Sequence, residues 1–406
     1  MSDALAGLRD YRTRDEHVIV GLMTGTSADG VDAVLVRFRG LGLESTHEVV
    51  GYRESPLEEE LRREILAVAR AESLPPERLM RLDAALGERY AAAVLELLAA
   101  AGTMPRTVDA IGMHGQTVRH VPRVDGRGVA LTLQLGSAAI VAERTGIAVV
   151  SDFRSRDTAA GGEGAPLVPL ADWWLFRSAK ESRALLNLGG MANLTWLPAG
   201  RGIEDVIAFD TGPGNALLDA LAAMASRGAE RFDRDGRSAA RGRPSQALLD
   251  ELLADPFFDR PPPRSTGRER FGEGGAEQLI QRAASLGLGD DDLMATAVAF
   301  TAASVALAIE RWVRPRGAVD TVYASGGGCQ NPALMRSLAD RLAPVPLKRI
   351  ERLGVASESK EALAFAFLAH QSLCGQAGNV PGATGAQHAA VLGHVTPGAL
   401  ASGARA

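Results

Sequence analysis

The stretch VIVGLMTGTSADGVDAVLVRF, residues Val18–Phe38, decides the fold. Two runs rich in β-branched residues flank a turn of Gly, Thr, Ser and Asp, which predicts a β-hairpin. A turn of this composition can present consecutive backbone N–H groups to an anion such as phosphate. A Walker A loop needs Gly-Lys-Ser/Thr at the start of a helix, and this turn has neither the lysine nor a following helix. On this stretch alone, a plain hairpin turn with polar side chains remains an equal alternative.

The composition is that of an ordinary globular protein. The chain has 406 residues, enough for two or three domains. Its net charge of −5 provides no basic field, so neither nucleic acid nor a membrane surface is expected as a partner. The two cysteines, Cys329 and Cys374, exclude a disulfide scaffold and fit a reducing compartment. The N-terminus lacks an apolar signal segment, so we expect a cytoplasmic location.

Strands alternate with helices along the chain, which predicts the α/β class. Hairpins with Gly turns at residues 18–38 and 183–197 hint at an internal duplication, although the two halves are too different to define a repeat. We expect an N-terminal lobe over residues 1–181 and a C-terminal lobe over residues 182–385. A last segment, residues 386–406, is expected to pack back toward the N-terminal lobe.

Glycine turns follow strands at three more places, in LNLGGMAN, FDTGPGN and ASGGGCQNP. Each turn can aim N–H groups at a phosphate or lie under a nucleotide. One such turn is weak evidence, since glycine also ends strands for steric reasons. Four of them in one α/β chain favour nucleotide binding. The glycines concerned are Gly189, Gly190, Gly212, Gly214, Gly326, Gly327 and Gly328.

Asp210 follows an apolar strand and precedes a glycine turn. Catalytic carboxylates of open α/β sheets lie at such strand ends, and Asp210 could serve as a general base toward a hydroxyl or water. The alternative is an aspartate that caps the next helix or braces the turn. The cap position is poor, because Asn215 lies closer to the helix start.

Several polar residues allow two interpretations, one as a ligand contact and one as part of the protein surface or its own loop. Arg154 and Arg156 could each bind a carboxylate bidentately, or belong to a solvated loop. His114 could bind substrate or only its own loop; with His120 it forms no metal site. The Arg-dense segments FDRDGRSAARGR and RSTGRERF are solvated faces or ligand contacts, and Glu361 alone would be read as a surface residue. Carboxylates beside the first turn, Asp29 and Asp32, could hold a hydrated Mg²⁺.

Together the motifs resemble those of the anhydro-N-acetylmuramic acid kinases, a family of the actin/Hsp70/sugar-kinase superfamily. The resemblance runs from about Ile19 to Gly385 and rests on the following motifs in order: GLMTGTSADGVDAVLV, GMHGQTVRH, SDFRSRDTAAGGEGAPLVP, LNLGGMANLT, FDTGPGN, RFDRDG, RSTGRERF, SGGGCQNPALM and SKEALAFAFLAH. It implies a two-lobed actin-like ATPase (ribonuclease H-like) fold with a central ATP cleft. It also implies ATP and Mg²⁺, the substrate 1,6-anhydro-N-acetylmuramic acid, a homodimer, and a role in peptidoglycan recycling.

The resemblance also assigns roles to residues of this sequence. The first phosphate loop and its flank would be Thr24, Gly25, Thr26, Ser27, Ala28, Asp29, Gly30 and Val31, with Asp29 reaching Mg²⁺ through water. Gly189 and Gly190 would form the second phosphate loop, and the SGGG turn would lie by the adenosine. Asp210 would be the catalytic base, and Arg154 and Glu361 would bind the sugar; His114, from its own motif, stays a candidate sugar contact. The family more often has Ser and Leu where this chain has Thr24 and Ala28, and neither change removes a group that ATP needs.

The implied reaction opens the anhydro ring and phosphorylates the sugar in one process. Asp210 would activate a water that attacks the anomeric carbon, while the departing O6 takes the γ-phosphoryl group of ATP. An inverting glycosidase needs a second carboxyl to protonate the leaving oxygen; here the phosphoryl group would replace it. The alternatives are a kinase for another sugar of the superfamily and a nucleotide-gated actin- or Hsp70-like binding protein. The absence of a peptide-binding module in the sequence disfavours a chaperone.

Overall fold

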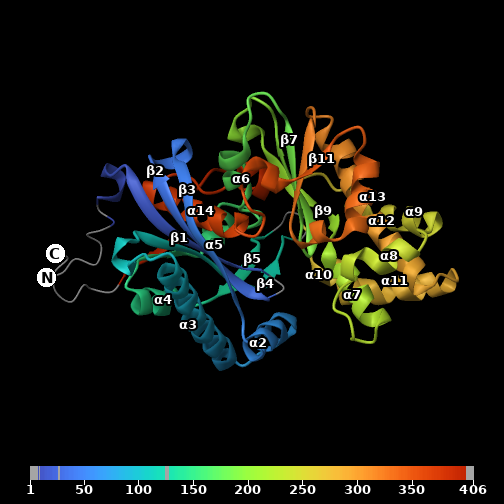
Figure 1. The fold of residues 1–406 in the computed structure, drawn as a ribbon, viewed down its shortest axis with the longest axis horizontal. Helices are drawn as coiled ribbons and strands as arrows, with labels where there is room; N and C mark the ends of the chain where they lie inside the picture. The colour runs from blue at the N-terminus through green and yellow to red at the C-terminus, as the bar shows by residue number, and fades with distance from the viewer. Residues whose placement is uncertain (1–7, 9, 26–27, 124–127, 399–406) are drawn as a thin grey trace. The chain divides into compact units, whose positions relative to one another are not determined.

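The computed structural model describes residues 8, 10–25, 28–123 and 128–398 (Figure 1). By its internal contacts the chain divides into unit 1, Met1–Trp174 with Glu358–Ala406, and unit 2, Leu175–Ser357. The sequence predicted a boundary near Ser182 and put the late helix in the second lobe. The contacts instead put this helix, α14 (Lys360–Cys374), in unit 1, because it packs on strands of the first sheet.

Unit 1 is built on a seven-stranded sheet with the order β12-β6-β4-β1-β2-β3, and β5 pairs with β4. Its strands are β1 (Glu16–Thr24), β2 (Gly30–Arg39), β3 (Thr46–Pro56), β4 (Ala110–Val121), β5 (Leu131–Leu135), β6 (Val149–Ser151) and β12 (His394–Thr396). β1, β4 and β6 run parallel, whereas β1, β2 and β3 form an antiparallel meander. The predicted hairpin over Val18–Phe38 is therefore confirmed, with β1 and β2 paired from Glu16↔Arg39 to Met23↔Asp32.

Helices cover both faces of the central part of this sheet, which explains why β1, β2 and β4 are buried along most of their length rather than at alternate residues. The helices of unit 1 include α2 (Glu59–Arg70), α3 (Pro76–Ala100), α4 (Ala138–Thr145), α5 (Phe153–Ala159), α14 and α15 (Pro381–Thr384). Val20 and Leu22 of β1 belong to one buried cluster with apolar residues of α3. In Figure 1, α3 and α14 lie on opposite sides of β1.

Two glycines let α14 approach the other face of the sheet. A Cβ on Gly21 would lie 2.0 Å from the carbonyl oxygen of Ala362, and one on Gly112 would lie 2.2 Å from that of Phe365. No side chain fits at such distances, so glycine is required at both positions. This close packing fixes the first turn of α14, and with it Glu361, against β1 and β4.

Unit 2 contains a five-stranded sheet with the order β11-β10-β7-β8-β9. Its strands are β7 (Arg183–Leu188), β8 (Met191–Leu197), β9 (Ile207–Pro213), β10 (Thr321–Ser325) and β11 (Leu347–Arg349). β7, β8 and β9 form an antiparallel meander, and β10 runs parallel to β7. Unit 1 has the same arrangement: β1, β2 and β3 form an antiparallel meander, and β4 runs parallel to β1. The shared topology supports the duplication that the two Gly-turn hairpins suggested.

The helices of unit 2 are α7 (Asn215–Ala225), α8 (Arg237–Arg241), α9 (Gln246–Leu253), α10 (Arg268–Phe271), α11 (Glu273–Ser285), α12 (Asp290–Ala308) and α13 (Pro332–Leu342), while α6 (Pro169–Phe176) contains the division between the units. The stretch Asp290–Val313 is long and apolar enough to cross a membrane, but most of it is buried inside the protein. A helix that is apolar on all sides and surrounded by protein is a core helix.

Some short helices were not predicted, because the composition of their segments is typical of loops. α8 and α9 lie in the Pro- and Arg-rich stretch 227–273 and were not predicted from the sequence. α9 has a standard start, since the hydroxyl of Ser245 accepts a hydrogen bond from the N–H of Leu248. α5 lies in the segment that was read as a charged loop, and Asp152 caps it through the N–H of Ser155.

Candidate active site

The β7–β8 turn is locked onto the start of α7. The N–H groups of Gly214 and Ala216 donate to the carbonyl oxygen of Gly190, at 3.1 and 3.0 Å, and the N–H of Asn215 donates to that of Gly189 at 2.8 Å. A Cβ on Gly214 would lie 2.4 Å from the Gly189 oxygen. The FDTGPGN and LNLGGMAN glycine motifs are therefore one packed structure. The first N–H groups of α7 are occupied within it.

The SGGG turn rests on the same structure. Gly326 has φ +88°, and a Cβ there would lie 2.6 Å from Oδ1 of Asn187. A Cβ on Gly328 would lie 2.7 Å from the Cβ of Leu188, whose carbonyl accepts a 3.0 Å hydrogen bond from Nδ2 of Asn215. Because β7 and β10 are parallel neighbours, their carboxyl ends lie together, where open α/β sheets bind ligands. Three of the four predicted glycine turns thus converge in unit 2.

Asp210 lies on β9 within this region. It pairs with Asn193 next to a bulge in the β8–β9 ladder, and its side chain is half-buried. The N–H of Thr266 donates a 2.8 Å hydrogen bond to Oδ2 of Asp210. α7 has no side-chain cap, so the capping alternative is wrong. The carboxylate is instead oriented by the RSTGR segment, residues 264–268.

Arg264 anchors that segment. Its guanidinium is buried and donates to the carbonyl oxygens of Asp210, Phe257, Phe258 and Arg260 at 2.9 to 3.2 Å. The N–H of Asp210 in turn donates to the Arg264 carbonyl at 3.0 Å. Burial lowers the pKa of Arg264 to about 10, and the nearby Asp210 carboxylate acts in the opposite direction. The Arg-dense motif read as solvated or ligand-binding therefore begins with a structural arginine.

The first glycine turn belongs to unit 1. Thr24 is buried, and its hydroxyl donates to the Tyr90 hydroxyl at 3.1 Å. The carbonyl oxygen of Gly25 accepts from the N–H of Ala28, which has φ +53°, and from Nε2 of Gln116. Gly30 and Val31 begin β2 and are buried. Thr26 and Ser27 lie outside the described residues, so their predicted contacts with phosphate remain predictions.

The carboxylates beside this turn already have protein partners. Asp29 is exposed and lies 3.3 Å from Nε of Arg62. Asp32 accepts a 2.6 Å hydrogen bond from the Tyr52 hydroxyl, and burial raises its pKa to about 6. Over the described ranges, no group of three or more metal-ligating side chains occurs. Mg²⁺ in kinases binds one or two carboxylates, phosphates and water, so Asp29 fits as a single ligand if it exchanges Arg62 for the ion.

The predicted sugar-binding residues also lie together in unit 1. Nε of Arg154 donates to Nε2 of His114 at 3.0 Å, and Nδ1 of His114 lies 2.7 Å from the carbonyl oxygen of Gly115. Because a carbonyl only accepts, Nδ1 carries the proton and the ring is neutral. Burial lowers the pKa of His114 well below its usual value, and Arg154 lowers it further. His114 therefore holds Arg154 in place.

Arg154 and Glu361 influence each other. Burial lowers the pKa of Arg154 to about 10, which leaves it protonated near neutral pH, and Glu361 opposes this shift. Burial raises the pKa of Glu361, while Lys360 and Arg154 lower it. Lys360 itself forms a buried 2.9 Å ion pair with Asp172. In the part of the chain that the structure describes, the terminal nitrogens of Arg154 form no hydrogen bond, so they can bind a carboxylate.

A profile of the anhydro-N-acetylmuramic acid kinase family matches residues 17–398. The anhydro-N-acetylmuramic acid kinase of Caldanaerobacter subterraneus subsp. tengcongensis is 44% identical over 392 residues, covering 96% of this chain and 99% of that protein. The one of Salinibacter ruber is 45% identical over 397 residues, covering 97% and 99%. The chain belongs to the anhydro-N-acetylmuramic acid kinase family. The resemblance read from the motifs and the fold class that it implied are confirmed.

A solved structure with partial likeness is component A of the (R)-2-hydroxyglutaryl-CoA dehydratase of Acidaminococcus fermentans. It is 13% identical, covers 88% of this chain and 99% of its own, and has a TM-score of 0.46.

Some residues that shape the candidate site were not singled out by the sequence analysis. Asp157 is fully buried and accepts hydrogen bonds from Asn379, Thr384 and the N–H of Gly164. It thereby ties the loop after Arg154 to the C-terminal part of unit 1. In the sequence, the feature that could have identified Asp157 is the group of glycines that follows it. Gly162 is needed there because a Cβ at this position would lie 2.2 Å from the Asp157 carboxylate. The Lys360–Asp172 pair gave no local signal, because its partners are far apart in sequence.

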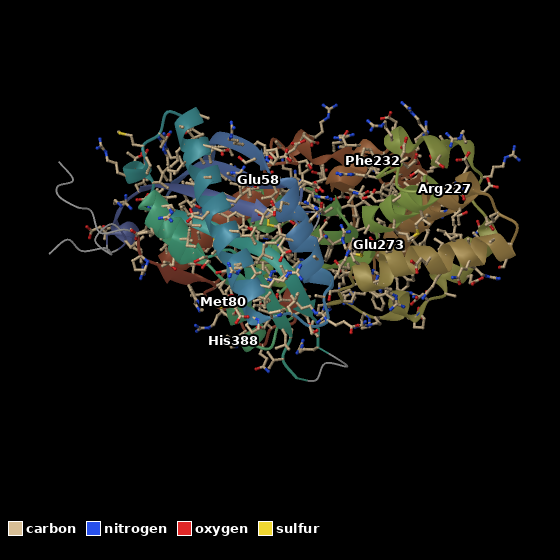
Figure 2. All side chains as sticks on the ribbon, turned by 90° about the horizontal axis from the view of Figure 1, so that it is seen from below. Glu58, Met80, Arg227, Phe232, Glu273 and His388 are labelled. Atoms are coloured by element: carbon tan, nitrogen blue, oxygen red, sulfur yellow. The ribbon has the colours of Figure 1, made fainter. Side chains whose placement is uncertain are left out.

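A pocket of about 710 Å³ lies elsewhere in unit 2, between the end of α7, α8 and the start of α12. Arg227 and Phe232, both labelled in Figure 2, are among its lining residues. Of the predicted site residues that the structure describes, none lines this pocket. Because none of the predicted site residues lines it, the volume of this pocket does not indicate a role in catalysis.

Proposed function

We propose that the chain is an ATP-dependent kinase that opens the anhydro ring of 1,6-anhydro-N-acetylmuramic acid and phosphorylates O6. The products are N-acetylmuramic acid 6-phosphate and ADP, as in peptidoglycan recycling. The family match over residues 17–398 carries this proposal. The hydrogen bond from Thr266 to Asp210 beside the converged glycine turns supports it, since a base must be held in a fixed orientation.

The chemistry begins with water at the anomeric carbon. Asp210 takes a proton from the water as its oxygen forms a bond to C1, and the C1–O6 bond breaks with inversion at C1. O6 takes the γ-phosphoryl group, and ADP departs. The phosphoryl group serves where a glycosidase would use an acid, so one carboxylate is enough.

The residues of unit 1 orient the sugar. The free guanidinium nitrogens of Arg154 bind the lactyl carboxylate of the substrate bidentately, with His114 fixing the guanidinium. Glu361 accepts a hydrogen bond from a sugar hydroxyl. Its raised pKa reflects burial without a hydrogen-bond donor among the described residues, which a hydroxyl would supply.

Backbone N–H groups of the glycine turns bind the phosphates of ATP. Thr24 to Val31 form the first phosphate loop and Gly189–Gly190 the second, while Gly326–Gly328 lie by the adenosine. Gly214 supports the second loop through its contacts with Gly189 and Gly190, and Gly212 pairs with Ala192, two residues after that loop. Mg²⁺, when bound with ATP, neutralises phosphate charge, and Asp29 would hold it through water.

The decisive test measures ADP release with 1,6-anhydro-N-acetylmuramic acid and, in parallel, with glucose and N-acetylglucosamine. We expect turnover with the anhydro sugar only, and ¹⁸O from labelled water at C1 of the product. Turnover with a simple sugar and no label at C1 would assign the chain to another sugar kinase activity. The same preparation, run in sedimentation velocity, tests the homodimer that we expect in solution.

A further inference from the structure

Arg268 lies over the β7–β8 turn. An ideal Cβ on Gly190 would be 3.7 Å from Nη2 and 3.9 Å from Nε of Arg268, and 3.8 Å from the Cβ of Ala216. The guanidinium therefore faces the backbone of the turn proposed to bind phosphate. Glycine at position 190 leaves this space open.

The positive charge of Arg268 has no ionic partner among the residues that the structure describes. Its side chain is exposed, and among the described residues it forms no hydrogen bond or ion pair. Its neighbours differ in this respect: Arg264 is saturated by backbone carbonyls, and Arg270 pairs with Asp255. Only Arg268 of these arginines presents an uncommitted guanidinium to the glycine turn.

The same short segment also holds the base. Thr266, two positions before Arg268, donates its N–H to Oδ2 of Asp210 at 2.8 Å. Arg264, at the start of the segment, fixes it to β9, since its Nε donates to the Asp210 carbonyl oxygen and its own carbonyl accepts from the Asp210 N–H. The anchored segment, residues 264–268, therefore places the N–H of Thr266 on the Asp210 carboxylate and the guanidinium of Arg268 over the β7–β8 turn.

We infer that Arg268 is a catalytic residue that binds the phosphoryl oxygens of ATP during transfer, an inference that rests on the proposed function. A planar guanidinium binds two phosphate oxygens at once. The transition state of phosphoryl transfer is loose and anionic, so a fixed cation stabilises it more than the ground state. Because Thr266 and Arg268 belong to one segment that Arg264 anchors, the position of the base is linked to that of the bound phosphoryl group.

The test compares Arg268→Gln, Arg268→Lys and the control Arg270→Ala, which removes a positive charge from the same turn of α10. We expect Arg268→Gln to lower kcat about 10²–10³-fold, as does loss of one donor to a transition-state charge. Arg268→Lys should recover part of this loss, because it keeps the charge but not the bidentate geometry. Arg270→Ala should retain the wild-type kcat, and guanidinium ion added to Arg268→Gln should restore part of the rate.

A binding measurement separates this inference from the proposed function. By calorimetry, Arg268→Gln should bind a non-hydrolysable ATP analogue more weakly than wild type and bind AMP equally well. A wild-type protein without turnover on the anhydro sugar would count against the proposed function, while the difference in analogue binding would still support Arg268. A variant Arg268→Gln with the wild-type kcat, or one that loses AMP and ATP-analogue binding equally, overturns the role of Arg268.

Discussion

The backbone N–H of Thr266 and Oδ2 of Asp210 are joined by a 2.8 Å hydrogen bond. A hydrogen bond to the ionised form of a carboxylate stabilises that form, and a base must be ionised to accept a proton. The bond also fixes the direction of the carboxylate, since Arg264 anchors the segment that contains Thr266. A backbone N–H thus helps to hold the Asp210 carboxylate.

Substitution of Asp210 by Asn should abolish turnover without removing nucleotide binding. The amide keeps the shape and can still accept from Thr266, but it cannot take a proton from water. We expect kcat to fall about 10²–10⁴-fold, the usual loss when a general base is removed. Steady-state kinetics and calorimetry with an ATP analogue measure the two properties separately. Turnover close to that of the wild type would show that another group is the base.

Two glycine substitutions should separate packing from binding. Gly214→Ala places a Cβ 2.4 Å from the Gly189 oxygen, so the backbone must shift, and overpacking of this kind costs about 1–3 kcal/mol. Gly190→Ala meets nothing closer than 3.7 Å, so its thermal unfolding should match that of the wild type. Its methyl group would nevertheless occupy the space under Arg268 and weaken ATP binding. If Gly190→Ala binds ATP normally, the β7–β8 turn is not a phosphate site.

The sequence was sufficient where local patterns determine structure. The Val18–Phe38 hairpin and the β7–β8 hairpin around Gly189–Gly190 form as predicted. A helix follows the strand at Asp210 as predicted, but β9 extends to Pro213, so Asp210 lies within the strand and not after it. Each depends on short-range signals, namely β-branched runs and glycine turns. The family was recognisable for the same reason, because its motifs are contiguous.

Properties that depend on contacts distant in sequence could not be predicted. Glu361 reads as a surface residue, yet packing of α14 on Gly21 and Gly112 brings it near Arg154. That same packing moves α14 into unit 1, against the expected division. Likewise, nothing around position 266 reveals that its N–H meets Asp210, because that contact depends on the hydrogen bonds of Arg264 to carbonyls of two other segments, β9 and residues 257–260.

The buried Lys360–Asp172 pair next to Glu361 should be important for stability. Asp172→Asn removes the carboxylate charge that lies 2.9 Å from the Lys360 ammonium, which is 7% exposed. Breaking a buried pair on one side typically costs about 3–5 kcal/mol, measurable by chemical denaturation. Glu88→Gln, which breaks the exposed pair with Arg144, is the control and should leave the unfolding midpoint unchanged. Equal effects of the two substitutions would mean that burial does not set the strength of the Lys360–Asp172 pair.

Buried histidines should make the protein acid-sensitive. Burial lowers the pKa of His370 from 6.5 to about 3, and its Nδ1 lies 2.6 Å from the Tyr11 hydroxyl. Because the folded-state pKa is depressed, the unfolded chain binds the proton first. The contribution to stability is therefore complete above pH 6.5 and is lost as the pH falls toward 3.

His370→Gln keeps an acceptor for Tyr11 but does not titrate. Between about pH 6 and 4, we expect it to reduce the pH slope of the unfolding free energy by about 1.4 kcal/mol per pH unit, the value for one proton. Chemical denaturation at several pH values measures this slope. His388, which is exposed and labelled in Figure 2, provides the control, since His388→Gln should leave the slope unchanged. If His370→Gln keeps the wild-type slope, protonation of His370 does not contribute to acid unfolding, and the other histidines whose pKa burial lowers, His17, His47, His114 and His120, would have to account for it.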